Sequence, residues 1–309
     1  MLSILRPKKA TKIQIKSRKY LFRRGLWYIV GFLLFYAPFA YFNKALTWML
    51  HGDKGGDIHA TCFRIPIANL FGGKGIDLLS VQGISLLLLM GSAFFVGAFF
   101  CARLCTAGAI SEYVSRLVPD QFKIDWTKYV NPAPIRYGFL AGFILAPLTT
   151  GSLNCSYCTY GFLEKMMNGG LWRDIGVLSS TIILTAFLWL IIFGALTKGG
   201  RGYCNFMCPV GALQSLIHSV GARLPFTYKL KYAKEKCVSC QSCVKACPMK
   251  ALKLGDEKIT YSIHHCITCR QCTAVCPTNA ITYGAGNRGW NQATIPMISE
   301  PCTETQKGV

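Results

Sequence analysis

Long apolar stretches alternate with basic ones along this chain, and four of the apolar stretches contain no Asp, Glu, Lys or Arg. They cover residues 25–43, 78–102, 137–163 and 175–197. Each supplies about the 20 apolar residues that a helix needs to cross a bilayer, with the polar end of the third stretch placed at the interface. Runs such as residues 86–90 lack the polar stripe that a helix of a soluble protein usually shows. The pattern therefore predicts four transmembrane helices.

The basic residues gather on one side of these predicted spans. The chain of 309 residues has 34 Lys and Arg against 13 Asp and Glu, a formal net charge of +21, although 52% of its residues are hydrophobic. Most of the basic residues lie in 1–24, 103–136 and 198–309, which alternate with the predicted outer loops 51–77 and 155–174. By the positive-inside rule both termini face the cytoplasm, and we expect a multi-pass protein of the cytoplasmic (inner) membrane. The charge thus reports orientation, with attraction to lipid second, and no nucleic-acid binding is expected.

The strongest chemical signal is a cysteine run that occurs twice near the C-terminus. Cys237 to Pro248 and Cys266 to Pro277 both follow C-x2-C-x2-C-x3-C-P, the bacterial pattern for two [4Fe–4S] clusters, in which the fourth cysteine binds the other cluster. We expect Cys237, Cys240, Cys243 and Cys276 to hold the first cluster, and Cys266, Cys269, Cys272 and Cys247 to hold the second. Zinc sites would not explain this rhythm twice, and disulfides are not expected in a reducing cytoplasm. His264 and His265, just before the second run, are expected at the surface.

A second cysteine pattern stands where the second and fourth apolar stretches end. Cys101 and Cys105 are four residues apart, as are Cys204 and Cys208, so each pair would share one face of a helix. Both pairs belong to the predicted cytoplasmic side. We predict that these four cysteines hold a third [4Fe–4S] cluster at the membrane surface. The alternative is four small, buried thiols at helix ends.

Together these features resemble the NapH-type membrane subunits of periplasmic nitrate reductase systems, which are proposed quinol dehydrogenases and are related to NosR-, MauN- and CcoG-like polyferredoxins. The resemblance rests on the stretches 204–213 and 50–52 and on the eight cysteines of the tail. It implies a subunit that uses quinone or quinol and exchanges electrons with a partner redox protein, such as a ferredoxin, a cytochrome c or an iron–sulfur subunit. Thr106 departs from the family, which usually has a proline after the first cysteine pair.

Three cysteines on the predicted outer side are not explained by that resemblance. Cys62, Cys155 and Cys158 could form one disulfide and leave one thiol, or they could form an outer-face redox or metal site. No histidine follows Cys158 as c-type haem attachment would require. His51 and His59, also on the outer side, are candidate proton acceptors for quinol oxidation, with ordinary loop histidines as the alternative.

The sequence thus predicts a membrane α-helical domain with four transmembrane helices, joined to a small α+β two-[4Fe–4S] bacterial ferredoxin-like domain. Its expected divisions are a basic arm (1–24), the transmembrane domain (25–200), a connector carrying the second cysteine pair (201–231), the ferredoxin domain (232–285) and a tail (286–309). The expected function is electron relay between the quinone pool and a partner redox protein of an anaerobic-type respiratory chain. Electron flow in the reverse direction, from a ferredoxin, is one alternative. A redox maturation factor for an extracytoplasmic metalloenzyme is another.

Overall fold

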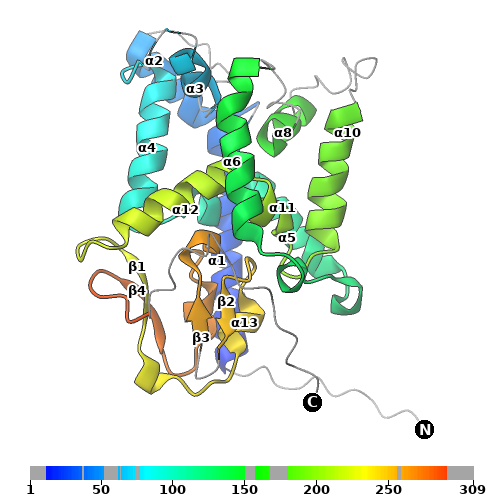
Figure 1. The fold of residues 1–309 in the computed structure, drawn as a ribbon, viewed down its shortest axis with the longest axis vertical. Helices are drawn as coiled ribbons and strands as arrows, with labels where there is room; N and C mark the ends of the chain where they lie inside the picture. Colours follow the sequence, from blue (N-terminus) through cyan, green and yellow to red (C-terminus); the bar gives the residue numbers. More distant parts are fainter. Residues whose placement is uncertain are drawn as a thin grey trace.

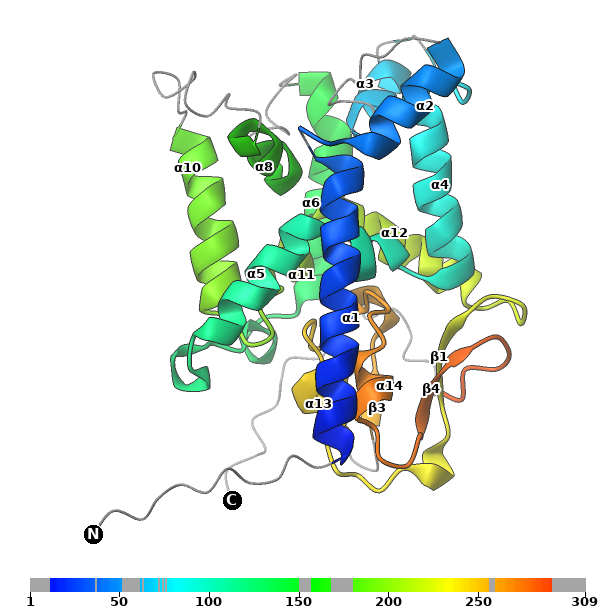
Figure 2. The same ribbon diagram turned by 180° about the vertical axis from the view of Figure 1, so that it is seen from behind.

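The computed structural model describes residues 12–36, 38–51, 62, 64–71, 73, 75, 77–149, 157–167, 180–255 and 259–290. Helices form the upper part of the molecule in Figure 1, and a smaller lobe of short strands and helices lies below them. Helix α1 (Lys12–Phe35) belongs to both parts, because in Figure 2 its first half runs beside the lower lobe and its second half stands among the upper helices. The helix is basic in its first half and apolar in its second, which suits these two surroundings.

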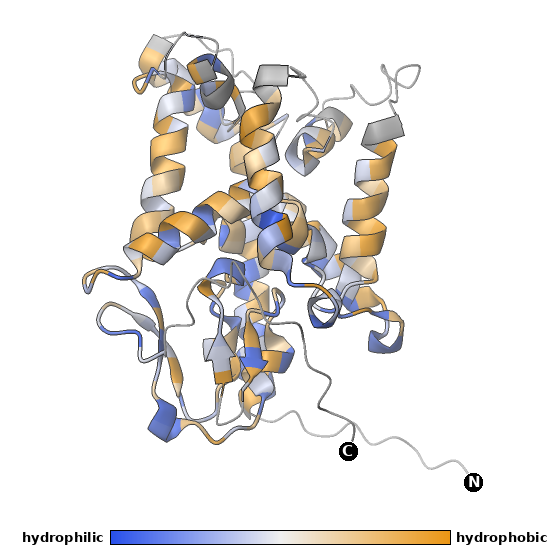
Figure 3. Ribbon diagram, viewed as in Figure 1, coloured by the Kyte–Doolittle hydropathy of each residue, from blue (hydrophilic) through white to orange (hydrophobic). Residues whose placement is uncertain are grey.

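Three further helices stand roughly upright in Figure 1 and carry mostly apolar side chains (Figure 3). They are α4 (Val81–Val96), α6 (Pro132–Thr149) and α10 (Ser180–Phe187). Helix α4 begins where the Ser80 hydroxyl accepts a hydrogen bond of 3.1 Å from the Gly83 amide. Pro132 occupies the first position of α6, where its missing N–H leaves no hydrogen bond unmade.

Wider, π-helical turns lead from two of the upright helices into helices that cross beneath them. Turn η2 (Phe100–Leu104) follows α4, and turn η6 (Leu188–Ala195) continues α10. The crossing helices are α5 (Thr106–Leu117), the short α11 (Gly202–Phe206) and α12 (Pro209–Gly221). Helix α5 packs on η6, and α12 packs on both α4 and α6. The remaining helical segments are α2 (Tyr41–His51), α3 (Arg64–Phe71), α8 (Thr159–Met167), η3 (Asp120–Phe122) and η4 (Trp126–Lys128).

The prediction of four membrane-spanning helices is not confirmed by the helices that form. Across the ranges given above, none is both long enough and apolar enough to cross a bilayer. The apolar stretch 78–102 is divided, because α4 has 16 residues and ends at Gly97 before η2 begins. The stretch 175–197 is divided in the same way, since α10 gives way to η6 after 8 residues. Hydropathy alone does not register such changes of helical pitch.

The lower lobe is built from two copies of one small unit. Strand β1 (Lys229–Tyr232) pairs antiparallel with β4 (Ile281–Gly284), and β2 (Leu252–Leu254) pairs antiparallel with β3 (Ile259–Tyr261). The helical segments are η7 (Lys234–Lys236), α13 (Ser242–Ala246), η8 (Ile263–His265) and α14 (Gln271–Val275). Left-handed backbone recurs at matching positions of the two units, in the pairs Ser239 and Thr268, Gln241 and Arg270, and Lys250 and Asn279. The predicted repeat is therefore present in the backbone as well as in the sequence.

Candidate iron–sulfur cluster sites

The four cysteines predicted to hold the first cluster line a single pocket. Cys237, Cys240, Cys243 and Cys276 share it with apolar side chains that include Ile259 and Ile281. The left-handed residues Ser239 and Gln241 lie between the first three cysteines and fold the chain around the pocket. Cys276 comes from the second run, as the crossed ligand pattern requires.

The four cysteines predicted to hold the second cluster also converge. The Cys272 thiol lies within electrostatic range of the thiols of Cys266, Cys269 and Cys247. Backbone amides already point at two of these sulfurs: the Thr268 amide donates to Cys266 Sγ over 3.2 Å and the Ala251 amide to Cys247 Sγ over 3.3 Å. Such N–H···S contacts help to set the potential of a bound cluster.

The third set, from the two spaced pairs, meets at the junction of the upright and crossing helices. The thiol of Cys101 lies within electrostatic range of those of Cys105, Cys204 and Cys208. Burial raises the pKa of the Cys208 thiol to about 12, so a metal that binds this sulfur must displace a proton. In the described part of the chain, no three His, Cys, Asp or Glu side chains are grouped as ligands of a single metal ion. The thiolates of a four-iron cluster bind separate irons.

The two pairs do not lie on regular α-helical faces, and this part of the sequence prediction is wrong. Cys101 lies in the π-helical turn η2, and Cys105 caps the helix that follows, α5. Cys204 likewise lies in α11, while Cys208 caps α12. Each C-x3-C pair therefore spans the break between two helices, so the second sulfur sits at a helix N-terminus.

The two capping cysteines have the same local geometry. Cys105 Sγ accepts a hydrogen bond of 3.5 Å from the Gly108 amide, and Cys208 Sγ accepts one of 3.4 Å from the Gly211 amide. Helix N-termini stabilise thiolates, which are the form that binds iron. Thr106 begins α5 as Pro209 begins α12, so the missing proline does not alter the way the chain leaves the site. Sulfur ligands that already accept amide hydrogen bonds fit an iron–sulfur cluster.

The third set and the lower lobe form one continuous core. Cys101, with Ala98 and Ala102, is buried in the same hydrophobic core as the predicted ligands Cys266 and Cys269. This core also includes Cys243 and Cys272, and Cys204, Cys237, Cys247 and Cys276 pack against it. Gly97, with a φ of 81°, lies so close to Thr268 that a Cβ there would collide with the threonine side chain. Glycine at that position lets the end of α4 rest directly on the second cysteine run.

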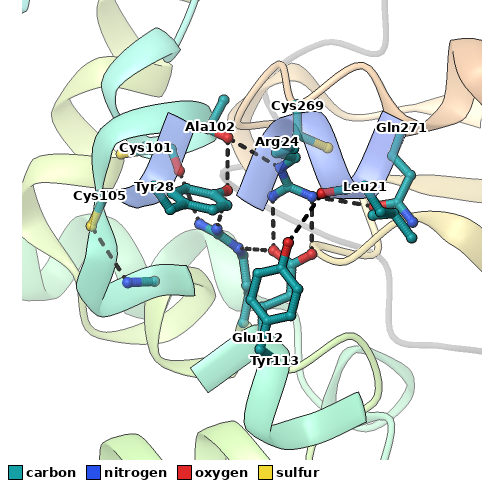
Figure 4. Close-up of polar contacts among 12 residues, drawn as sticks. Leu21, Arg24, Tyr28, Cys101, Ala102, Cys105, Glu112, Tyr113, Cys269 and Gln271 are labelled. Carbon is teal, nitrogen blue, oxygen red and sulfur yellow. Dashed lines mark hydrogen bonds and ion pairs between the residues drawn. The ribbon is translucent and has the colours of Figure 1, made fainter. Parts of the chain in front are cut away.

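A buried ion-pair network, which the sequence analysis missed, lies beside this core. Glu112 on α5 is 2.8 Å from Arg24 and 2.6 Å from Arg201, and all three side chains are almost completely buried. Burial by itself raises the pKa of Glu112, but the guanidinium groups of Arg24 and Arg201 outweigh it and lower the pKa to about 2. Figure 4 shows the Glu112 carboxylate below the Arg24 guanidinium, with Cys269 above that arginine and the turn from Cys101 to Cys105 to the left.

The network also includes backbone carbonyls of the turn that carries Cys101. Arg201 donates to the Cys101 carbonyl over 3.0 Å, and Arg24 donates to the Ala102 carbonyl over 3.1 Å. Arg24 also donates to the Gln271 side chain over 3.2 Å, beside the second cysteine run. The residues of this ion-pair network lie far apart in the sequence. The acidic residue Glu112 in a basic segment is the sequence feature that hinted at the network.

The remaining predicted residues are placed only in part. Cys62 is half-buried, and Cys158 caps α8, with its sulfur accepting a hydrogen bond of 3.4 Å from the Gly161 amide. Cys155, His59, Cys302 and the side chain of His51 lie outside the described residues. The expectation that His264 and His265 lie at the surface is wrong, because both are buried. The Tyr137 hydroxyl is 2.6 Å from His264 Nδ1, and Arg136 donates to the His264 carbonyl.

Two known families match the parts of the chain that contain the three cysteine sets. The family described as "4Fe-4S dicluster domain" matches residues 236–281, which contain the two runs. The family described as "4Fe-4S binding domain" matches twice, over residues 83–125 and 181–226. Each of those two matches contains one C-x3-C pair.

Relatives of this chain have names that point to electron transport. The protein named "Putative electron transport protein YccM", from Escherichia coli (strain K12), is 26% identical over 205 residues, which are 60% of this chain and 53% of the relative. MauN of Methylobacillus flagellatus, a "methylamine utilization ferredoxin-type protein", is 22% identical over 185 residues, 60% of this chain and 59% of MauN. The uncharacterized protein MJ0749 of Methanocaldococcus jannaschii is 27% identical over 164 residues, 51% of this chain and 54% of the relative.

The chain spans between 53% and 59% of the length of these relatives. It carries 4Fe–4S ferredoxin-type domains, and it is a distant homologue of ferredoxin-type electron-transport proteins. The predictions of [4Fe–4S] clusters and of an iron–sulfur electron-transfer function are confirmed at that level.

Proposed function

We propose that this protein is an integral membrane iron–sulfur subunit of the NapH type, which relays electrons between the quinone pool and a partner redox protein. Three [4Fe–4S] clusters form the relay. The third, held by Cys101, Cys105, Cys204 and Cys208, lies nearest the quinone, and the first lies nearest the soluble partner. When bound, such clusters accept and release single electrons with little rearrangement.

The observation that carries this proposal is the single core shared by the cysteine sets. Cys101 from the helical part is buried with Cys266, Cys269 and Cys272 of the lower lobe, and Cys243 of the first set belongs to the same core. A contiguous row of one-electron sites suits a relay, because the protein around the sites holds their ligands in place and shields the inner ones from water. The residues of the chain bind, orient and shield the clusters.

The surface of the helical part supports a membrane location. Large apolar side chains are about half exposed on α4 and α10, including Leu87 at 52%, Leu88 at 55% and Ile183 at 55%. Exposed large apolar side chains of this kind are unfavourable in water and suit contact with lipid or with a partner protein. We propose that the apolar segments 25–43, 78–102, 137–163 and 175–197 lie in the cytoplasmic membrane, with the lower lobe in the cytoplasm, as the distribution of basic residues suggests.

Electron exchange with quinone tests the proposal directly. The purified protein, reconstituted in liposomes, should lose the visible absorbance of its oxidised clusters when a quinol analogue is added and regain it with a quinone. The Cys204→Ser Cys208→Ser variant should keep the two ferredoxin clusters and respond more slowly or not at all. No exchange with either quinol or quinone in the wild-type protein would exclude the quinone relay.

A second candidate function, electron delivery to an outer partner, is favoured by the surroundings of Cys158. The hydroxyl group of Tyr203 donates to the Tyr157 carbonyl, and the ring lies within electrostatic range of both Cys158 and Cys208. Tyr36 is placed in the same way between Cys158 and Cys105. Aromatic side chains thus connect Cys158 to the third cysteine set. Under this alternative, Cys158→Ser would abolish activation of an extracytoplasmic enzyme and leave quinone exchange intact.

A further inference from the structure

Arg136, at the start of α6, is a buried cation with unused hydrogen-bonding capacity. Its side chain is 0% exposed. One nitrogen, Nη1, donates to the His264 carbonyl, whereas Nε and Nη2 have no partner among the described residues. A buried guanidinium with two unsatisfied donor groups is costly, and native proteins rarely leave such groups unpaired.

The unpartnered nitrogen faces the third cysteine set. A Cβ added to Gly211 would lie 2.8 Å from Arg136 Nη2 and 3.7 Å from Cys208 Sγ. The guanidinium and the thiol therefore flank the same glycine, whose own amide donates to Cys208 Sγ. Arg136 and the Cys208 thiol also interact electrostatically.

The other half of the site has a matching arginine. A Cβ added to Gly108 would lie 2.6 Å from Arg201 Nη1 and 3.4 Å from Cys204 Sγ. Arg201 thus lies against Gly108, three residues after Cys105, as Arg136 lies against Gly211, three residues after Cys208. The two cysteine pairs each bring one buried arginine to the third site.

The two arginines differ in how their charge is balanced. Glu112 neutralises Arg201 at 2.6 Å, and it also pairs with Arg24. Among the ion pairs of the described residues, none includes Arg136. An isolated buried charge requires a counter-ion or coordination by polar groups. A cluster with four thiolate ligands is an anion and gains another negative charge when it is reduced.

We propose that Arg136 is the counter-ion of the third [4Fe–4S] cluster and raises the reduction potential of that cluster. The positive charge favours the reduced, more negative state, and the unused N–H groups stand beside the Cys208 ligand. The inference rests on the third cluster of the proposed function. Because Nη1 contacts the carbonyl of His264, two residues before Cys266, the same charge also acts, more weakly, on the second cluster.

Redox titration of the full-length protein, followed by electron paramagnetic resonance, tests this role. The signal of the third cluster is the one that disappears in the Cys204→Ser Cys208→Ser variant. In Arg136→Gln, we expect the equilibrium constant for reduction of the third cluster to fall about tenfold, which is about 59 mV for one electron. The potential of the first cluster should not change. Arg136→Lys, which keeps the charge, should restore most of the wild-type potential.

Arg116→Gln is the matched control, because it removes an arginine charge that is 34% exposed and already paired with Glu112, and the reduction potential of the third cluster should stay unchanged. The iron content of the wild-type protein shows whether the third cluster is present, and it therefore tests the proposed function separately from the role of Arg136. If the wild-type protein binds only two clusters, the third cluster of the proposed function is absent and the role of Arg136 falls with it. If three clusters are present, an unchanged potential in Arg136→Gln, or equal losses in Arg136→Gln and Arg136→Lys, would overturn the counter-ion role alone. Loss of the third cluster in Arg136→Gln but not in Arg136→Lys would support it.

Discussion

The two cysteine runs of the lower lobe have one sequence pattern and two different environments. In the first run Cys240 is exposed and Cys237 is half-buried, whereas Cys266, Cys269 and Cys272 of the second run are all buried. Helix α1 packs along α14 of the second run, η8 before Cys266 packs on α12, and the end of α4 rests on Thr268. The Tyr20 hydroxyl of α1 donates to the Cys269 carbonyl over 2.5 Å. Among the described helices, no helix of the upper part packs on α13 of the first run to a comparable extent.

This difference shows how one ligand pattern can serve two roles. The exposed first site suits electron exchange with a soluble partner, because an electron must enter or leave where partners can approach. The buried second site suits internal transfer toward the third site, which shares its core. The spacing of the cysteines determines where clusters can bind. The helices packed around each run determine how far each site is exposed, and therefore which electron-transfer role it suits.

The largest effect should come from removing the Glu112 carboxylate, which joins α5 to Arg24 of α1 and to Arg201. Glu112→Ala would leave Arg24 and Arg201 buried without a counter-charge, and breaking a buried ion pair in this way costs about 3–5 kcal/mol. We expect the second cluster to be lost at a lower temperature, as measured by resonance signals during heating, with the first cluster affected less. Asp120→Ala, which removes an ion pair whose carboxylate is 87% exposed, is the control and should change neither. Equal loss of both clusters in Glu112→Ala would contradict the difference between the two runs.

Acid should weaken the packing around His218 before it weakens the Glu112 ion pairs. Burial, aided by Arg288 and Lys229, lowers the pKa of His218 on α12 from 6.5 to about 4. The unfolded chain therefore binds more protons between these values, and stability is lost as pH falls from about 6.5 towards 4, by about 3 kcal/mol at most. The Glu112 pairs persist there, because the pKa of Glu112 is about 2 and their contribution is lost only at lower pH.

Chemical denaturation at pH 7.5 and pH 5 should show this loss in the wild-type protein and a smaller one in His218→Gln. An identical pH dependence in the two proteins would mean that His218 is not the group responsible.

Exposure also predicts the order in which the clusters are lost. A chelator combined with an oxidant should remove iron from the first cluster several times faster than from the second, because Cys240 is open to solvent. Resonance spectra taken during the reaction would follow the two signals separately. Faster loss of the second cluster would show that α1 does not shield it.

The smallest effect is expected from a matched pair of substitutions across the repeat. Gln271 accepts a hydrogen bond of 3.2 Å from Arg24, while Ser242 holds the corresponding position of the first run. Gln271→Ala should cost about 1 kcal/mol in stability and Ser242→Ala less. Denaturant midpoints of the two variants, compared with the wild-type protein, provide the measurement. A larger loss for Ser242→Ala would reverse the comparison.

The candidate cluster ligands could be predicted from the sequence because their spacing is local. The C-x2-C-x2-C-x3-C-P rhythm needs no tertiary contact to be read, and the two C-x3-C pairs could be joined through their equivalent positions. The prediction that each pair lies on one helical face was wrong, because the spacing of the cysteines does not show that one helix ends and another begins between them. Arg24 and Glu112 lie 88 residues apart, and Arg136 and His264 lie 128 apart, so their pairing depends wholly on the fold. No periodicity in the sequence could reveal those contacts.

Iron and acid-labile sulfide content, measured on the purified full-length protein, tests the central claim of three clusters most directly. The account predicts about twelve irons and about twelve sulfides per chain in the wild-type protein, and about eight of each in Cys204→Ser Cys208→Ser. About eight irons in both proteins would contradict the third cluster and, with it, the proposed path from the membrane surface to the ferredoxin lobe.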